Sequence, residues 1–172
     1  KGNAYQANDG VYFHIDSAPE KYGELTGQNI EAVRSGAGGR VDGTGSGKRD
    51  HKDFALWKAA KPGEPTWDSP WGPGFPGWHI ECSAMSLKFL HGHVNVHVGG
   101  IDLRFPHHEN ERAQSNSITG VESVDLWVHG EHLLFEGRKM SKSAGNVVLL
   151  DDVITKGFDP LSLRLCFLEN RY

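Results

Sequence analysis

The sequence predicts an α/β fold, because segments with the periodicity of strands alternate with segments with the periodicity of helices. Residues 79–90 are predicted to be helical, and residues 94–98 (Val-Asn-Val-His-Val) alternate as a half-buried strand does. Residues 107–117 follow Pro106 and predict a second helix, and residues 124–128 predict a second strand. With 172 residues, the chain is long enough for one domain with a core of ordinary size.

The first fifty residues predict a hairpin followed by a loop. Residues 4–6 and 11–15 flank Asn8-Asp9-Gly10, and an Asp-Gly pair supplies the positive φ angle that tight hairpin turns need. Residues 16–50 are polar and rich in glycine. Such a stretch buries too little apolar surface to order itself, so we predict a flexible loop or linker there.

Proline residues predict a loop in the next segment and the start of a helix in the last one. Residues 54–57 form a short apolar run, and five prolines between Pro62 and Pro76 predict an ordered loop after it. Near the end, Asp159 and Pro160 predict the start of a final helix, with the aspartate as N-cap and the proline at the first helical position.

Charge, cysteine content and hydropathy exclude several function classes. The chain has 18 basic and 22 acidic residues, and this balance argues against a chain that grips a nucleic-acid backbone over a broad surface by itself. Its two cysteines, Cys82 and Cys166, have no framework spacing, so we expect a reducing compartment. No apolar run approaches the roughly 20 residues of a membrane-spanning helix, and we expect no signal peptide at the start.

Histidine is concentrated in one part of the chain, where eight of the ten residues lie between His79 and His132. His107 and Glu111 are four residues apart and share one face of the predicted helix. Together with Cys82 they offer a thiol, an imidazole and a carboxylate, a set that suits zinc best. Three such ligands leave a fourth position open, or a fourth ligand lies outside this chain. The alternative is an exposed acidic helix start beside a buried cysteine.

A basic loop follows, over residues 138–146 (Arg-Lys-Met-Ser-Lys-Ser-Ala-Gly-Asn). It places three cations and two hydroxyls within six residues. Lysine ammonium groups suit the neutralisation of a polyphosphate whose charge shifts during transfer. The alternative is a solvated basic turn, which the spacing does not exclude.

Three motifs give the chain a family resemblance. Lys139-Met-Ser-Lys-Ser143 resembles the second signature of the class I aminoacyl-tRNA synthetases. Pro76-Gly-Trp-His-Ile-Glu-Cys-Ser-Ala-Met85 and Phe105-Pro-His-His-Glu-Asn-Glu111 resemble the cysteinyl-tRNA synthetases in particular, as does Asp53-Phe-Ala-Leu-Trp-Lys58. The resemblance extends from near residue 1 to Tyr172.

The resemblance implies the second half of a Rossmann-like class I synthetase catalytic core with an inserted connecting region. It implies that residues 1–75 belong to the connecting region, with the hairpin and the Gly-rich loop. Residues 76–158 would carry the second half of the nucleotide-binding core, with the zinc site and the basic loop of residues 138–146, here called the lysine loop. Residues 159–172 would begin a helical region that contacts the tRNA stem. The His-x-Gly-His signature that grips ATP and a further zinc cysteine would lie upstream of this chain.

The resemblance also implies roles for single residues. Cys82, His107 and Glu111 would hold zinc, which takes the thiolate of the substrate cysteine as an added ligand and so rejects serine. Trp78 would wall the cysteine pocket, and Asp102 would meet the ammonium group or the ribose. The remaining implied site residues are His79 and His108 for the substrate, His97, His129, Lys139 and Lys142 for catalysis, and Gly99, Asp102, Met140, Ser141, Lys142 and Ser143 for ATP.

The implied reaction has two steps. The carboxylate of cysteine attacks the α-phosphate of ATP, with Mg²⁺ present, and gives cysteinyl-adenylate and pyrophosphate; the adenylate then acylates tRNA(Cys). Positioning and charge stabilisation suffice for the first step, so no protein nucleophile is needed. We expect a cytoplasmic protein with no membrane contact, monomeric at full length, that meets the tRNA mostly through regions outside this chain.

Two other functions stay open on the sequence. Cysteine ligases of the mycothiol pathway resemble truncated cysteinyl-tRNA synthetases, share the zinc site and the lysine loop, and transfer cysteine to an amino sugar. The sequence of residues 109–115 (Glu-Asn-Glu-Arg-Ala-Gln-Ser) is closer to that of the synthetases. The other alternative is a non-catalytic fragment that binds cysteine or zinc, which an exposed apolar sheet edge would support.

Overall fold

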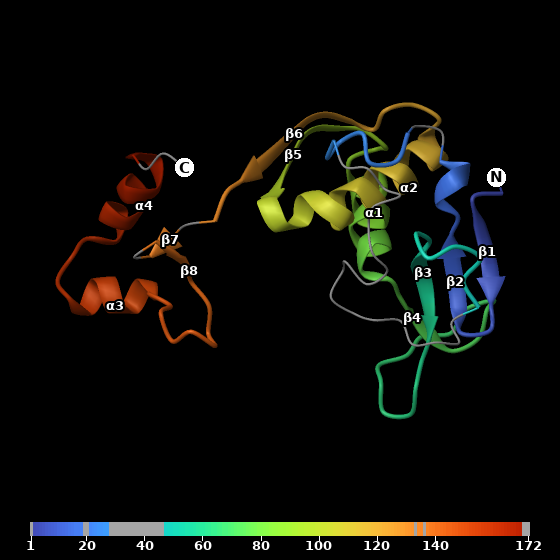
Figure 1. The fold of residues 1–172 in the computed structure, drawn as a ribbon, viewed down its shortest axis with the longest axis horizontal. Helices are drawn as coiled ribbons and strands as arrows, with labels where there is room; N and C mark the ends of the chain where they lie inside the picture. The colour runs from blue at the N-terminus through green and yellow to red at the C-terminus, as the bar shows by residue number, and fades with distance from the viewer. Residues whose placement is uncertain (1, 19–20, 28–46, 133, 136, 170–172) are drawn as a thin grey trace. The chain divides into compact units, whose positions relative to one another are not determined.

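The structure, a computed structural model, describes residues 2–18, 21–27, 47–132, 134–135 and 137–169. Helices and strands are mixed along the chain, as the predicted α/β class requires (Figure 1). The chain forms two compact units, Lys1–His129 and Gly130–Tyr172, and each is described by itself. The predicted division at residues 75 and 158 stays a prediction.

The first unit begins with an antiparallel sheet whose strand order is β1-β2-β3-β4. The predicted hairpin is confirmed, because β1 and β2 pair across residues 8–9. A Cβ atom at Gly10 would lie 2.1 Å from the carbonyl oxygen of Trp57, so only glycine lets β2 approach β3 this closely. The strands are β1 (Ala4–Ala7), β2 (Gly10–Phe13), β3 (Phe54–Ala59) and β4 (Gly74–Pro76).

A small apolar core joins this sheet to a helix. The rings of Phe13 and Phe54 stack with their centroids 5.0 Å apart, and Ile15 and Ala113 are buried with them. Ala113 belongs to helix α2 (Glu109–Thr119), so the core fixes the sheet against the element that carries Glu111. Beside it, buried Asp53 accepts hydrogen bonds from the Tyr5 hydroxyl and the Ile15 amide.

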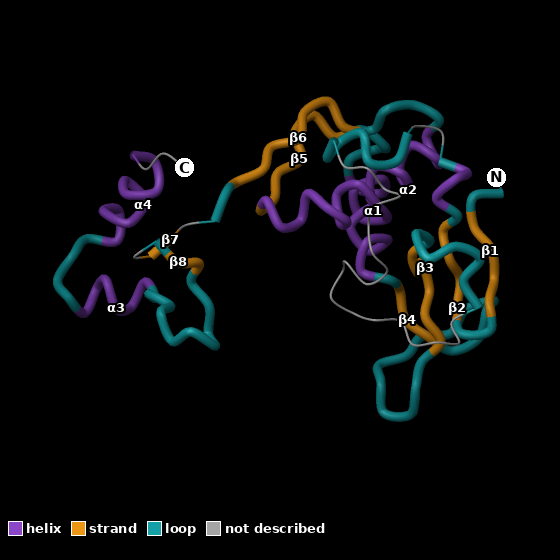
Figure 2. The backbone as a smooth tube through the Cα atoms, viewed as in Figure 1, coloured by secondary structure: helices purple, strands orange, loops and turns teal. Residues whose placement is uncertain are grey.

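The remainder of the first unit has α/β character. Strands β5 (Val94–Gly100) and β6 (Val124–Gly130) form a two-stranded sheet. Figures 1 and 2 show them side by side, with α2 in the connection between them, and the arrows of Figure 1 point in the same direction. Helix α1 (Trp78–Phe89) precedes β5 and packs against α2. The predicted helices and strands of this region therefore all form.

The start of α2 differs from the prediction. The α-helix begins at Glu109, because Phe105 has non-helical backbone angles (φ −136°, ψ 133°) and separates the preceding turns. His107 and His108 lie in the short helical segment Arg104–His108, which follows a 3₁₀ turn over Ile101–Leu103. Continuous helical angles from the kink onward still place His107 and Glu111 on one face.

One face of the β5–β6 sheet is apolar and uncovered. The alternate residues Val96 and Val98 of β5 and Leu126 and Val128 of β6 are 41–64% exposed. An apolar face of this kind favours burial against a further surface. The other face of the sheet carries His97, Trp127 and His129, whose side chains are partly buried.

The second unit is small. Strands β7 (Leu134–Phe135) and β8 (Arg138–Lys139) form a short antiparallel hairpin, and α3 (Leu150–Thr155), which the sequence analysis does not predict, follows the lysine loop. The final helix α4 (Pro160–Glu169) is as predicted. The Leu161 amide donates a hydrogen bond of 2.8 Å to Asp159 Oδ1, which confirms the N-cap.

Two loop predictions have different outcomes. The Pro-rich loop is ordered as predicted: Trp67 and Gly74 exchange backbone hydrogen bonds, and Ser69 Oγ donates to the Gly72 carbonyl. Most of the predicted flexible stretch, residues 28–46, lies outside the described residues. Among the described residues, no helix combines the length and apolar character needed to cross a membrane.

Candidate metal centre and lysine loop

Three predicted metal ligands come together in the first unit. The ligand atoms of Cys82 in α1, His107 before α2 and Glu111 in α2 all lie within 4.8 Å of one another. His107 Nε2 lies 2.5 Å from Glu111 Oε1, which places both side chains on one helix face as the spacing predicts. Both are buried, and Cys82 is half-buried.

The donor atoms of this set fit a metal ion. Among the described residues, none donates a hydrogen bond to Glu111 Oε1, although this oxygen is buried and close to His107 Nε2. A buried carboxylate oxygen without a donor is costly unless a cation meets it. A thiol, an imidazole and a carboxylate match the ligand types of zinc, and three of them leave a fourth position open.

Burial shifts the pKa of Cys82 and that of His79, which contacts His107. Burial raises the pKa of Cys82, and the carboxylates of Glu111 and Glu81 raise it further, so metal binding must displace a proton from the thiol. Burial beside His107 lowers the pKa of His79 to about 3. The two Nδ1 atoms of His79 and His107 lie 2.9 Å apart. A neutral His79 therefore fixes the ring orientation of His107, the usual role of a hydrogen-bond partner behind a metal ligand.

The other predicted histidines join the same cluster, His97 from β5, His129 from β6 and His108 from the segment before α2. His97 Nε2 lies 3.4 Å from Glu111 Oε2, and His108 Nδ1 lies 2.8 Å from His129 Nε2. Burial lowers the pKa of His108 to about 4, so this imidazole is neutral at pH 7. The rings of His97 and His108 also contact Trp127, with centroids 4.6 and 5.2 Å away.

Sequence reasoning missed Trp127. The alternation of β6 places residues 125, 127 and 129 on one face, so the prediction of His129 as a site residue could have identified its neighbour two positions earlier. The tryptophan ring contacts the rings of both His97 and His108.

The predicted substrate residues differ in their surroundings. The ring of Trp78 lies 4.4 Å from that of His107 and is 56% exposed, so it stands beside the metal ligands and faces solvent. A Cβ atom at Gly99 would lie 2.5 Å from His108 Cε1, so this glycine admits the imidazole. Asp102 is exposed, and no hydrogen bond joins it to the cluster within the described part of the chain.

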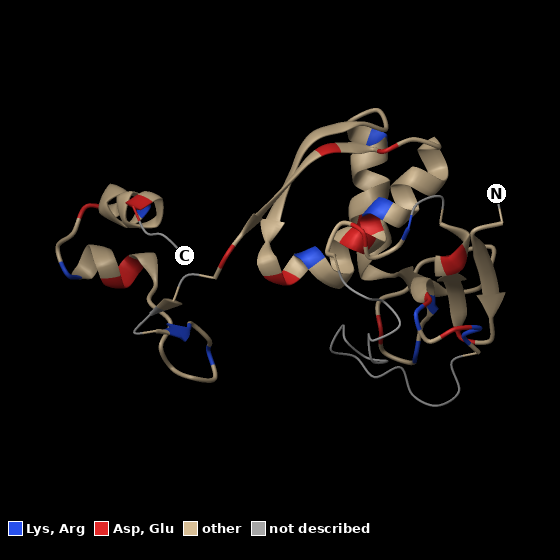
Figure 3. Ribbon diagram, turned by 45° about the horizontal axis from the view of Figure 1, so that its top comes forward, with Lys and Arg blue, Asp and Glu red and all other residues tan. Residues whose placement is uncertain are grey.

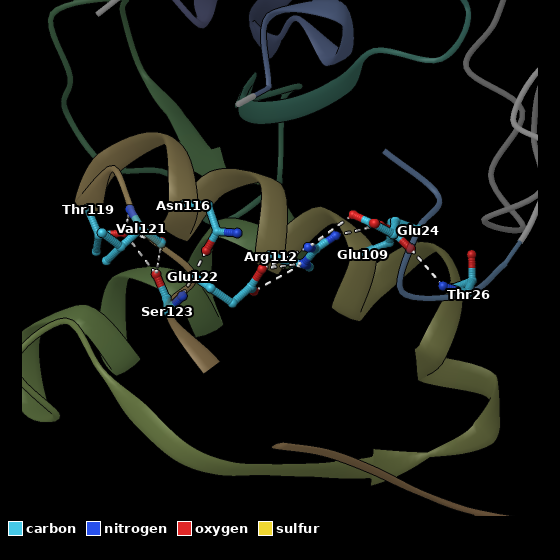
Figure 4. Close-up of polar contacts among 9 residues, drawn as sticks. All are labelled: Glu24, Thr26, Glu109, Arg112, Asn116, Thr119, Val121, Glu122 and Ser123. Carbon is cyan, nitrogen blue, oxygen red and sulfur yellow. Dashed lines mark hydrogen bonds and ion pairs between the residues drawn. The ribbon is translucent and has the colours of Figure 1, made fainter. Parts of the chain in front are cut away.

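A polar network joins α2 to the segment that contains Glu24 and Thr26 (Figure 4). The Thr26 amide donates to Glu109 Oε2, and the Tyr22 hydroxyl donates to Asn110 Oδ1. Arg112 forms a two-pronged pair with Glu122 and reaches Glu24 at 3.4 Å. Sequence reasoning missed this network, because its contacts to Tyr22, Glu24 and Thr26 join residues more than eighty positions apart.

The lysine loop lies in the second unit and is exposed. The Ser141 amide donates to Asn146 Oδ1, and Asn146 Nδ2 donates to the Lys139 carbonyl, so Asn146 closes the loop. Lys139 Nζ lies 3.1 Å from His132 Nε2. Lys142 and Ser143 are exposed and Met140 is half-buried. Figure 3 shows Lys and Arg (blue) on β8 and the loop after it.

Comparison with known proteins agrees with these features. The chain matches the family described as "tRNA synthetases class I (C) catalytic domain" over residues 1–172. It is 50% identical over 175 residues to the "Cysteine--tRNA ligase" of Rippkaea orientalis, a match that covers 100% of this chain and 36% of the relative. Proteins of the same name from Pyrococcus furiosus and Fusobacterium nucleatum are 51% and 52% identical over 172 residues, again over 100% of this chain and over 35% and 36% of their own lengths.

The chain thus spans 35–36% of the length of these relatives. The family match covers every residue of the chain, including both the metal cluster and the lysine loop. The chain therefore belongs to the family of class I (C) tRNA synthetase catalytic domains.

Proposed function

We propose that the chain is part of a cysteine–tRNA ligase, which activates cysteine with ATP and transfers it to tRNA(Cys). The observation that carries this proposal is the close set of half-buried Cys82 with buried His107 and Glu111 in a chain of this family. A thiol-containing metal set is a suitable selector for a thiol substrate, since soft thiolates bind zinc far better than hydroxyls do.

The chain's own residues would hold and orient the metal. Cys82, His107 and Glu111 would be the ligands, and His79 would keep His107 in position through the 2.9 Å contact. When bound, zinc supplies a coordination position that accepts the thiolate of cysteine. Trp78 would exclude water on one side of that position. His108 and His129 would line the pocket beside it, and Asp102 would meet the ammonium group or the ribose.

The lysine loop would serve the ATP phosphates. Lys139 and Lys142 would neutralise charge that moves from the α-phosphate to pyrophosphate, together with Mg²⁺. Met140, Ser141 and Ser143 would position the loop against the nucleotide, with Gly99 and Asp102 as further nucleotide contacts, and His97 would act beside the reacting groups. Attack by the cysteine carboxylate on the α-phosphate requires no protein nucleophile, so positioning and electrostatics suffice.

The proposed metal site also favours one cellular location. Cys82 must stay reduced to bind zinc, so we propose a cytoplasmic location. We further propose a monomer at full length, which size-exclusion chromatography with light scattering would check.

Cysteine-dependent ATP–pyrophosphate exchange tests the proposal on the polypeptide that carries these residues, with serine as control and zinc measured on the same sample. Exchange with cysteine but not serine supports it, and acylation of tRNA(Cys) rather than of an amino sugar then separates it from a mycothiol-type ligase. Bound zinc without exchange in the presence of all substrates would reject activation and favour a binding fragment.

A further inference from the structure

A second group of side chains that could hold a metal ion lies next to the first. The ligand atoms of His97, His108 and Glu111 are also all within 4.8 Å of one another, and this group contains no thiol. We propose that His97, His108 and Glu111 form a second divalent-metal position, which shares Glu111 with the cysteine-containing set. Two imidazoles and one carboxylate bind divalent transition metals such as Fe²⁺, Co²⁺ and Zn²⁺. The inference does not depend on the aminoacylation proposed above.

The shared carboxylate divides its two oxygens between the two groups. Oε1 lies 2.5 Å from His107 Nε2, whereas Oε2 lies 3.4 Å from His97 Nε2. A carboxylate in this arrangement can bridge two ions, and protein sites with two metals hold them about 3.5–4 Å apart. Glu111 is 3% exposed, so neither oxygen is satisfied by bulk water.

A neighbouring histidine supports the second position. His129 contacts one ring nitrogen of His108 at 2.8 Å and so fixes the orientation of the imidazole. Metal-ligating histidines commonly have such a partner.

The second position must be the weaker of the two. It lacks a thiolate, and two dications in one buried site would share only two anionic ligands, those from Cys82 and Glu111. We therefore expect the cysteine-containing set to fill first and the thiol-free set to fill only at higher metal concentration.

Titration of the metal-free chain with Co²⁺ distinguishes the two positions. Cobalt bound to a thiolate shows a sulfur-to-metal charge-transfer band in the near ultraviolet, whereas cobalt bound to imidazole and carboxylate shows only weak visible absorption. We expect two ions per chain by equilibrium dialysis. The charge-transfer band should saturate with the first ion, and the second should add visible absorption alone.

Matched variants assign the second ion. His97→Gln should weaken the second binding step by about tenfold or more and leave the charge-transfer band intact. His93→Gln is the control, because His93 pairs with exposed Asp125 outside the cluster and should keep both ions. Cys82→Ser should lose the band but retain the thiol-free ion, which would separate failure of the zinc site from failure of this inference. A wild-type chain that binds a single ion, or unaltered second binding in His97→Gln, would overturn it.

Discussion

The candidate metal cluster in the first unit and the lysine loop in the second are built in opposite ways. His107, His108 and Glu111 are 2–4% exposed and are held by neighbours from α1, β5 and β6. Lys139 and Lys142 are exposed, on a loop closed mainly by Asn146. Folding therefore fixes the geometry of the cluster. Substitutions there should change stability and metal binding together, whereas substitutions in the loop should change activity alone.

Lys142→Ala should produce the largest change on the loop side of this comparison. If the ammonium group stabilises charge on the ATP phosphates, its loss should lower the rate of ATP–pyrophosphate exchange by about 10²–10³-fold. Zinc content and unfolding temperature should be unchanged, because Lys142 is exposed. Lys156→Ala, an exposed lysine of the same unit, is the control and should retain the exchange rate. Equal losses of exchange rate in both variants would show that the loop has no specific role in the reaction.

Gly99→Ala should damage the cluster through packing. The added methyl group would lie 2.5 Å from His108 Cε1, so the imidazole must move and its contact with His129 must lengthen. We expect a loss of about 1–3 kcal/mol in the free energy of unfolding, the usual cost of overpacking. Gly130→Ala is the control, since nothing lies within 4 Å of a Cβ atom there. Equal unfolding free energies for the two variants in urea would show that the cluster is not tightly packed.

Tyr22→Phe tests whether the segment around Tyr22 supports α2, which carries Glu111 of the candidate metal centre. It removes the hydrogen bond to buried Asn110 and should lower the free energy of unfolding by about 0.5–1.5 kcal/mol. Tyr12→Phe removes a comparable hydrogen bond, to Asp9 in the turn between β1 and β2. Only the Tyr22 variant should also weaken zinc binding in a competition titration with a chelator. Unchanged zinc affinity would confine this contact to a structural role.

Glu122→Gln should have the smallest effect. The pair with Arg112 has its carboxylate 44% exposed, so solvent screens it. We expect a loss of at most about 1 kcal/mol in the free energy of unfolding, decreasing with added salt. A salt-independent loss larger than that of Tyr22→Phe would mean that the Arg112 network, and not the Tyr22 contact, carries the support of α2.

The elements around the cluster could be predicted from the sequence because they are periodic. The alternation in β5 and β6 and the helical spacing of α1 and α2 are local patterns. The start of α2 was predicted at residue 107, two residues before the observed start at Glu109. Pro106 is typical of a helix start, but His107 and His108 belong to the short segment that contains the extended backbone of Phe105. The two-residue strands β7 and β8 are too short for any periodicity to reveal.

The site could be predicted as a set of residues but not as an arrangement. The spacing of His107 and Glu111 is a local relation that any helix satisfies, and the thiol of Cys82 was expected near them from ligand chemistry. The contacts of Trp127 with His97 and of Tyr22 with Asn110 depend on the tertiary fold, so no local sequence pattern predicts them. Such long-range contacts decide which of the eight clustered histidines meet Glu111.

The zinc content of three chains tests the central claim most directly: the wild type, Cys82→Ser and Cys166→Ser, each loaded with zinc and dialysed against metal-free buffer. Cys166 lies in α4 of the other unit and is the matched control. We predict that the wild type and Cys166→Ser retain one tightly bound zinc ion per chain and that Cys82→Ser loses it. Equal zinc in the wild type and Cys82→Ser, whether bound or absent, would contradict the assignment of Cys82, His107 and Glu111 as the metal centre.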